Sequence, residues 1–204
     1  MEGVTGLLSL EGSNVLIEYS SIDHPERAFA SILKEWRKRG VKPLIVDISD
    51  TLHIFVQNLN FAGVELAIGD IPVIKVKGTA KVGNVLGTVG VVEDFDYHLA
   101  IYSRIARTVP EDSRKHTIVL GMDKFPFQFM DEPSKLERYF ETITRRYLYV
   151  KDKTSLLFLN VDVASEYLQK GLEQDSDYVI RVRNGGLAII KYPKETRGVD
   201  NEVY

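Results

Sequence analysis

Short apolar segments that alternate with segments of helical period constrain the fold of this chain more than any other feature. The segments 43–48 and 155–160 are mainly apolar runs, the pattern of strands that are buried on both faces of a parallel sheet. Between such runs, apolar residues recur at helical spacing, for example at Phe29, Ile32, Leu33 and Trp36. Strands that alternate with helices predict an α/β fold with a mainly parallel central sheet.

The expected elements follow from this alternation. We expect strands at 14–19, 43–48, 71–76, 117–120 and 155–160, and a closing pair at 178–182 and 187–190. Asn184-Gly185-Gly186 between the last two is a hairpin signal. The glycine-spaced segment 78–90 predicts a loop and hairpin excursion, and the spacing of Leu136, Phe140, Ile143 and Tyr147 predicts a helix.

Composition bounds the class of protein. With 204 residues, 44% hydrophobic and 27% charged, the chain fits one globular domain over 1–193 with a flexible tail at 194–204. Cysteine is absent, which excludes disulfides and thiolate metal sites, and no metal or cofactor site is evident. No long apolar stretch or signal peptide is present, so we expect a cytoplasmic protein. A net charge of −3 argues against binding to nucleic acid or an anionic membrane.

The turn after the first strand is notable for what it lacks. A phosphate-binding loop at this place would carry glycines, whose N–H groups cradle phosphates, and a lysine. Here the turn 20–24 has neither; Pro25 stands where the lysine would be, and Glu26 where a Mg²⁺-binding Ser or Thr would be. Proline has no N–H, and the glutamate adds negative charge at the helix start. The sequence therefore predicts a site closed to nucleotide phosphates. Asp23 is expected to cap the helix, with Glu26 completing a capping box.

Four side chains are candidate ligand contacts at the carboxyl ends of the first two strands, where α/β folds bind ligands. They are Ser20, Ser21, Asp47 and Asp50. The two serines lack the flanking glycines of a hydrolase nucleophile and fit turn residues. For the two aspartates the alternative is structural, with Asp50 capping the next helix and Asp47 bonding within the turn.

Three phenylalanines, Phe125, Phe127 and Phe129, follow the strand at 117–120 in a loop context. They are either packed in the interior or form an apolar patch that recruits a protein partner. These residues are the best sequence candidates for an interaction surface.

The order of strands resembles the core of RecA/KaiC-like ATPases. The segments that carry the resemblance are the strand entering the phosphate loop (12–19), the second strand (40–47), the Walker B strand (117–123) and the terminal hairpin (177–191). More narrowly, the chain is similar to an archaeal family of unknown function that is related to KaiC-type proteins but lacks their phosphate loop. The resemblance implies a three-layer α/β core with a mainly parallel sheet and a C-terminal β-hairpin. Asp47 falls where this superfamily often has a catalytic carboxylate, and Gly121 replaces the Mg²⁺-binding acid.

The departures from the family pattern shape the functional prediction. Without the Walker A lysine and the Walker B acid there is no charge clamp for phosphoryl transfer, so we do not expect an enzyme. The sequence predicts a non-catalytic RecA/KaiC-like domain that acts through a protein partner or as a homo-oligomer, in a regulatory or assembly role. The alternative is a nucleotide-binding protein or ATPase with a modified phosphate site.

Overall fold

A computed structural model describes residues 10–90, 94–124, 131–148, 150, 152–183 and 186–193. The helices are α2 (Pro25–Lys38), α3 (Thr51–Phe61), α4 (Phe95–Ala106), α5 (Glu111–Lys115), α6 (Pro133–Tyr139), the π-helix η2 (Phe140–Thr144), α7 (Arg145–Leu148) and α8 (Glu166–Asp175). The strands are β1 (Asn14–Tyr19), β2 (Leu44–Ile48), β3 (Pro72–Val76), β4 (Asn84–Val89), β5 (His116–Leu120), β6 (Thr154–Asn160), β7 (Tyr178–Arg183) and β8 (Gly186–Lys191). Within these described ranges, no helix has the length and hydropathy to cross a membrane.

The strands form one sheet in the order β4-β3-β2-β5-β6-β1-β7-β8. Each described neighbouring pair is parallel except β7 and β8, which run antiparallel as the hairpin signal predicts. Parallel pairing places the carboxyl ends of β1, β2, β3, β5 and β6 along one edge of the sheet and their amino ends along the opposite edge. Ligand sites of α/β folds lie at the carboxyl edge.

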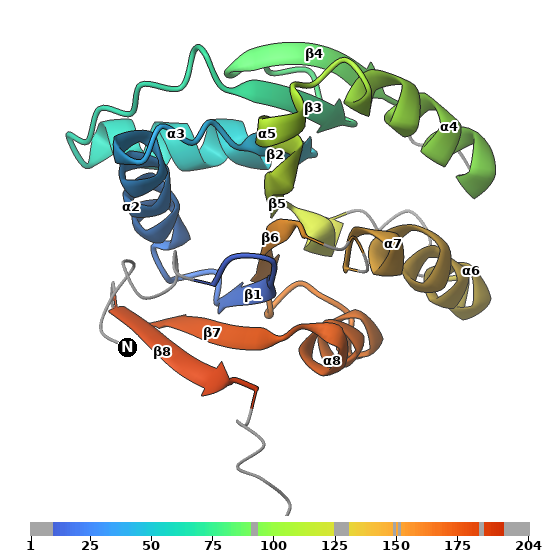
Figure 1. The fold of residues 1–204 in the computed structure, drawn as a ribbon. Helices are drawn as coiled ribbons and strands as arrows, with labels where there is room; N and C mark the ends of the chain where they lie inside the picture. The colour runs from blue at the N-terminus through green and yellow to red at the C-terminus, as the bar shows by residue number, and fades with distance from the viewer. Residues whose placement is uncertain are drawn as a thin grey trace, which may run out of the picture.

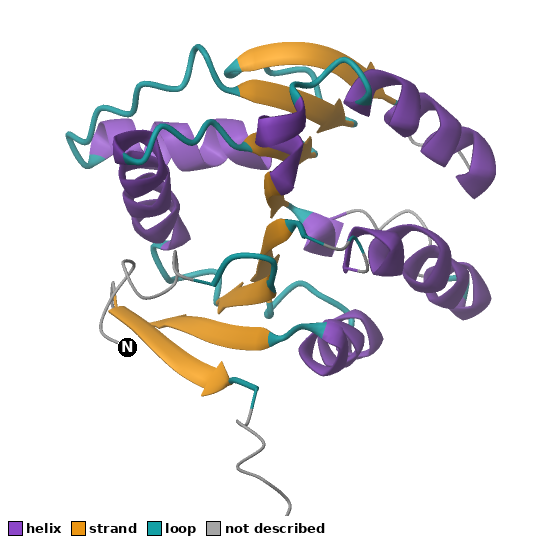
Figure 2. Cartoon of the chain, in the orientation of Figure 1, coloured by secondary structure: helices purple, strands orange, loops and turns teal. Residues whose placement is uncertain are grey.

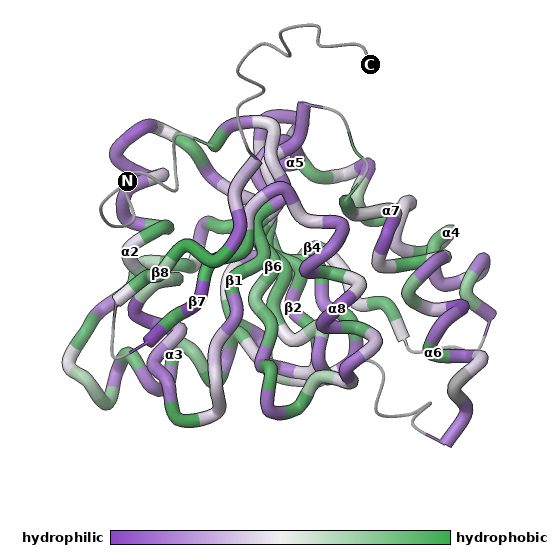
Figure 3. Tube along the Cα trace, turned by 90° about the horizontal axis from the view of Figure 1, so that it is seen from below, coloured by the Kyte–Doolittle hydropathy of each residue, from purple (hydrophilic) through white to green (hydrophobic). Residues whose placement is uncertain are grey.

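Helices cover both faces of the sheet, giving three layers (Figures 1 and 2). On one face, α2 and α3 bury Phe29, Trp36 and Phe55 against the sheet; Phe55 and Phe158 stack edge to face at 5.9 Å. On the other face, α4, η2 and α8 bury a second core with Phe95, Phe140, Ile143 and Leu172. The most apolar stretches of the chain therefore lie in the central strands, as the hydropathy colouring shows (Figure 3).

The predicted alternation of strands and helices is confirmed, with one correction. The segment 78–90 does not form a hairpin excursion: its second half is β4, which pairs in parallel with β3 at the end of the sheet. The predicted helix marked by Leu136, Phe140, Ile143 and Tyr147 is present as α6, η2 and α7, which follow one another without a gap; in the π-helical turn η2 the hydrogen bonds reach one residue further along the chain. The predicted tail, 194–204, lies outside the described residues.

Candidate functional site

In the turn after β1, backbone N–H groups are hydrogen-bonded to carboxylates of the same chain. The Asp23 carboxylate accepts hydrogen bonds from the backbone N–H and the hydroxyl of Ser20, at 2.8 and 2.9 Å. The Asp162 carboxylate, which follows β6, accepts one from the Ser21 N–H at 2.8 Å. Asn160 donates to the Ser21 hydroxyl at 3.1 Å. Anionic oxygens of this chain thus occupy N–H groups that a phosphate loop would offer to a nucleotide.

The predicted capping box at the start of α2 is wrong. His24, not Asp23, is the N-cap residue, and the His24 side chain makes no capping hydrogen bond; the Asp23 carboxylate bonds to Ser20. Pro25 begins the helix, a position where the missing N–H of proline removes no helical hydrogen bond. Glu26 is buried and lies 2.9 Å from His24 Nδ1.

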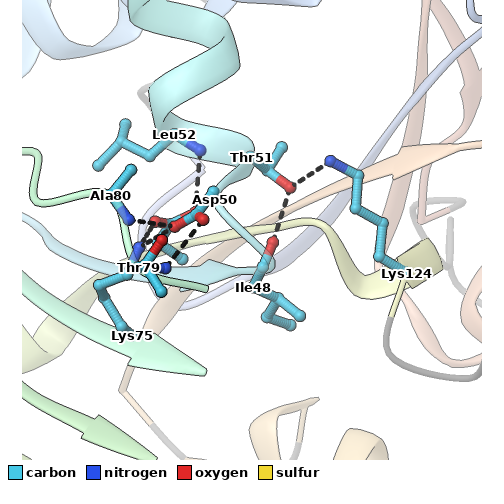
Figure 4. A network of polar contacts seen from close by, with 9 residues as sticks. Ile48, Asp50, Thr51, Leu52, Lys75, Thr79, Ala80 and Lys124 are labelled. Atoms are coloured by element: carbon cyan, nitrogen blue, oxygen red, sulfur yellow. Dashed lines mark hydrogen bonds and ion pairs between the residues drawn. The ribbon is translucent and has the colours of Figure 1, made fainter. Parts of the chain in front are cut away.

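The turn after β2 contains a buried ion pair. Lys75, from the middle of β3, donates to the Asp47 carboxylate at 2.7 Å, and both side chains are at most 3% exposed. The other Asp47 oxygen accepts a hydrogen bond from the Leu52 N–H at 2.9 Å, at the start of α3 (Figure 4). Asp47, at the position of a catalytic carboxylate in the resembling superfamily, therefore has both oxygens engaged within the chain.

Asp50 joins the same network from a left-handed backbone conformation, with φ of 59°. Its carboxylate accepts hydrogen bonds from Lys75 at 2.6 Å and from the backbone N–H groups of Thr79 and Ala80 at 2.9 and 3.0 Å (Figure 4). Burial alone would raise the pKa of Asp50, but these hydrogen bonds outweigh it and lower the pKa below its usual value. Burial likewise opposes the charge on Lys75, and the bonds from Asp47 and Asp50 outweigh it and raise the Lys75 pKa.

Two glycines allow these turns to approach one another closely. Gly121 follows β5 with φ of +81°, and a Cβ there would overlap the Ile48 carbonyl oxygen and the Thr51 hydroxyl. Gly78, with φ of +84°, leaves no room for a side chain beside the Asp50 carboxylate. Gly121 is the position at which the resembling ATPases hold Mg²⁺ with an acidic side chain. The close approach of Ile48 and Thr51 leaves no room for a side chain at position 121.

The Asp123 side chain is buried close to the turn after β1. Its Oδ1 accepts a 3.3 Å hydrogen bond from the Asn160 N–H, and no described residue bonds to its buried Oδ2. Burial raises the pKa of Asp123, and the nearby charge of Lys124 does not compensate. Burial, followed by the charges of Asp123 and Glu26, also raises the pKa of the Tyr19 phenol.

The predicted ligand residues fall into two separate groups. Ser20 and Ser21 belong to the turn after β1, whereas Asp47 lies near the end of β2 and Asp50 in the turn that follows it, and β5 and β6 lie between β1 and β2. Phe125, Phe127 and Phe129 lie outside the described residues. Sequence reasoning missed Lys75, although a lysine within an otherwise apolar strand must be paired when buried.

A family model described as "Pyrococcus protein of unknown function, DUF257" matches residues 9–200. The chain belongs to the DUF257 family. No curated protein matches it. Among solved structures, a Pyrococcus horikoshii protein from a structural study aligns with a TM-score of 0.79 and 22% identity, over 95% of this chain and 94% of that one.

Two further P. horikoshii structures support the RecA/KaiC-like resemblance of this DUF257 chain. A KaiC-like protein aligns with a TM-score of 0.54 and 15% identity, covering 92% of this chain and 82% of that one. An uncharacterized protein in complex with an unknown peptide aligns with a TM-score of 0.51 and 17% identity, covering 90% and 85%. At these identities the likeness concerns the fold.

The described part of the DUF257 chain contains no cluster of three His, Asp or Glu side chains suited to a metal ion. A cavity of about 440 Å³ lies beside the turn after β1, and its walls include Tyr19, Asp23 and Arg181. Arg181 is paired with the buried carboxylate of Glu18. The charge of this arginine is therefore neutralised within the chain.

Proposed function

We propose that this DUF257 protein is a non-catalytic RecA/KaiC-like domain that acts through protein–protein contact, as a regulatory or assembly subunit. Its nucleotide site is degenerate: the residues that would bind phosphates and Mg²⁺ are absent, and carboxylates of the chain are bonded to the N–H groups of the turn. The proposal has two parts, closure of the site and a contact surface, and each has its own test.

The main support for a closed nucleotide site is the hydrogen bonding of the Ser20 and Ser21 backbone N–H groups. Their N–H groups are already bonded to the carboxylates of Asp23 and Asp162. A phosphate would have to displace these carboxylates and then approach their negative charge. Because phosphate loops bind through free N–H groups and a lysine, this turn lacks the means to hold a triphosphate.

The turn after β2 supports the same reading. Lys75 pairs with both Asp47 and Asp50 from within the sheet, so that an oxygen of each carboxylate is engaged by the chain rather than offered to a metal ion or a catalytic water. Gly121 has no room for an acidic side chain. A nucleotide bound here would lack its Mg²⁺ anchor and the charge clamp of phosphoryl transfer.

Protein contact is supported by the edge strand β8. In the described part of the sheet β8 pairs only with β7, and Ile190 and the following Tyr192 are 55% and 64% exposed. Exposed apolar side chains on a sheet edge are suited to binding another chain. A structural neighbour of similar fold was solved in complex with an unknown peptide, which supports contact with another chain.

The closure is tested by thermal denaturation with ATP, ADP or GTP and Mg²⁺. A ligand at one hundred times its dissociation constant adds roughly 2.7 kcal/mol of stability, which a melting curve detects readily. We expect no shift with any of the three. A clear shift would overturn the closed site and favour the alternative, a nucleotide-binding protein that uses the cavity beside Tyr19 and Arg181.

The contact surface is tested by light scattering and by affinity capture from the native lysate. We expect self-association or a captured partner for the wild-type protein, and loss of either in the Ile190→Lys/Tyr192→Lys variant. Ile54→Lys is the matched control, because Ile54 is an exposed isoleucine on α3, 43% accessible, away from β8. A strict monomer without partner, or equal loss in both variants, would contradict the contact surface.

A further inference from the structure

A cavity at the opposite edge of the sheet belongs to neither turn described above. It has a volume of about 290 Å³ and lies where β2, β5 and β6 begin. Leu44 is the first residue of β2, Arg114 lies in α5 just before β5, and Lys153 directly precedes β6. Because β2, β5 and β6 are neighbours in the sheet, the topology brings these three residues together.

The walls of this cavity are mainly apolar. Leu99, Tyr102 and Ala106 line it from one side of α4, and Leu44 and Val150 complete the apolar lining. Small-molecule sites in proteins combine an apolar cavity of about this size with a few convergent polar groups. The apolar part of a ligand would therefore replace water against α4.

The charged side chains among the described residues that line the cavity are both positive. Arg114 and Lys153 both line it, and none of the described lining residues is acidic. Asp152, with a left-handed φ of 60°, forms the turn that leads into Lys153 and β6. Burial lowers the pKa of the Lys153 ammonium to about 8. An anion bound beside this amine would stabilise its charged form.

We propose that this cavity is a binding site for a small monocarboxylic acid with an apolar body. The carboxylate lies between Arg114 and Lys153, and the apolar body lies against Leu44 and the α4 side chains. Arginine and lysine favour a carboxylate through charge-assisted hydrogen bonds. This site is independent of the nucleotide-site closure and of the β8 contact surface, so its failure would leave both untouched.

Isothermal titration calorimetry with octanoate and octanamide tests the proposal, because the two probes share the apolar chain and differ in charge. We expect octanoate to bind at least tenfold more tightly than octanamide. Lys153→Met and Arg114→Gln should each weaken octanoate binding by roughly tenfold, the usual effect of one charged hydrogen bond, and leave octanamide binding unchanged. Lys34→Met and Arg104→Gln, which remove exposed charges elsewhere, are the matched controls and should bind both probes as the wild type does.

A further variant distinguishes binding inside the cavity from a general attraction of octanoate to positive charge on the protein surface. Ser103 is an exposed residue of α4 on the cavity wall, so Ser103→Phe fills space without disturbing the core. It should weaken both probes equally, with an unchanged circular dichroism spectrum. Equal affinity for octanoate and octanamide, absence of octanoate binding to the folded protein, or equal losses in the Lys34 and Lys153 variants would each overturn the proposal. Arg114 is exposed, so its variant keeps the test valid if Lys153→Met does not fold.

Discussion

The turn after β1 and the turn after β2 lie at the same edge of the sheet, and each binds backbone N–H groups with two carboxylates. After β1, the carboxylates of Asp23 and Asp162 are partly or fully exposed to solvent. After β2, Asp47 is buried and its charge is balanced by the equally buried Lys75. In both turns carboxylates of the chain engage backbone N–H groups, but only in the second is a carboxylate of the network part of the core. If this difference matters, substitutions at the buried network after β2 should destabilise the fold more than substitutions at the exposed turn after β1.

The largest effect is expected from Lys75→Met. Removing the cation leaves Asp47 as an uncompensated buried charge, which is destabilising by about 3–5 kcal/mol. Urea denaturation at neutral pH measures the change. The double variant Lys75→Met/Asp47→Asn should recover part of the loss, because it removes the stranded charge. A loss of less than about 1 kcal/mol, the range of a surface ion pair, would show that the pair is solvated.

A smaller effect is expected where β5 packs against the turn after β2. Gly121→Ala combines a left-handed φ with overlap of the Ile48 carbonyl, and we expect a loss of about 3 kcal/mol. Gly63→Ala is the matched control, because Gly63 also has a positive φ, +68°, but no atom within 4 Å of a Cβ. Its loss should be about 1 kcal/mol, from backbone strain alone. Equal losses in urea denaturation would mean that the turn moves aside, and that an acidic side chain could be restored at position 121.

The turn after β1 should tolerate more change and still bind no nucleotide. In the variant His24→Gly/Pro25→Lys/Glu26→Thr, a phosphate-loop lysine and hydroxyl are restored. We expect it to fold with a loss of roughly 1–2 kcal/mol, from the loss of proline rigidity and of two buried side chains. A capping box makes no contribution, because none is present.

Thermal denaturation with ATP and Mg²⁺ gives the second readout for this variant. We expect no shift, since the Ser20 and Ser21 amides remain bonded to Asp23 and Asp162. A folded variant that binds ATP tightly would show that the carboxylates yield to phosphate. The closure would then depend on residues 24–26 alone.

The helices and most strands were predictable because the patterns that indicate them involve residues close together in the sequence. Apolar runs and helical spacing are set by neighbours in sequence, so the order of strands and the closing hairpin follow from them. β4 was missed because its residues are half-exposed and include glycine, so that pairing with β3 rather than local pattern makes it a strand. The π-helical turn at Phe140 is likewise invisible to a spacing rule.

The site was only partly predictable, for a related reason. The absent phosphate-loop residues can be read directly from the turn at 20–26. The groups that bond to these turns come from elsewhere in the chain: Asp162 is 141 residues from Ser21, and Lys75 is 28 from Asp47. Asp50 is the N-cap residue of α3 as predicted, but its side chain bonds to Lys75 and the next loop, and it is the Asp47 side chain that accepts from an α3 amide. Such contacts depend on which strands become neighbours.

The smallest effect is expected at Asp123, near the turn after β1, where we expect a gain in stability rather than a loss. The pKa of this carboxyl is raised by burial, so the folded state holds its proton more tightly than the unfolded state and becomes relatively less stable as pH rises through the raised value. Asp123→Asn retains the acceptor for the Asn160 N–H and removes the charge. We therefore expect a gain of roughly 0.5–1 kcal/mol at pH 7.5, because the variant removes a carboxyl charge that burial disfavours.

Asp50→Asn provides the contrast from the other turn, because the pKa of Asp50 is lowered. The stability that Asp50 contributes is present above the unfolded carboxyl pKa near 4 and disappears as pH falls through the lower folded value. This variant should therefore lose stability at pH 7.5. Urea denaturation at pH 7.5 and at successively lower pH should show the Asp123→Asn gain shrinking first, while the Asp50→Asn loss persists to lower pH. If both variants lost stability at pH 7.5 by the same amount, Asp123 would be ionised and paired like Asp50, and the two turns would not differ in the way that their burial and charge imply.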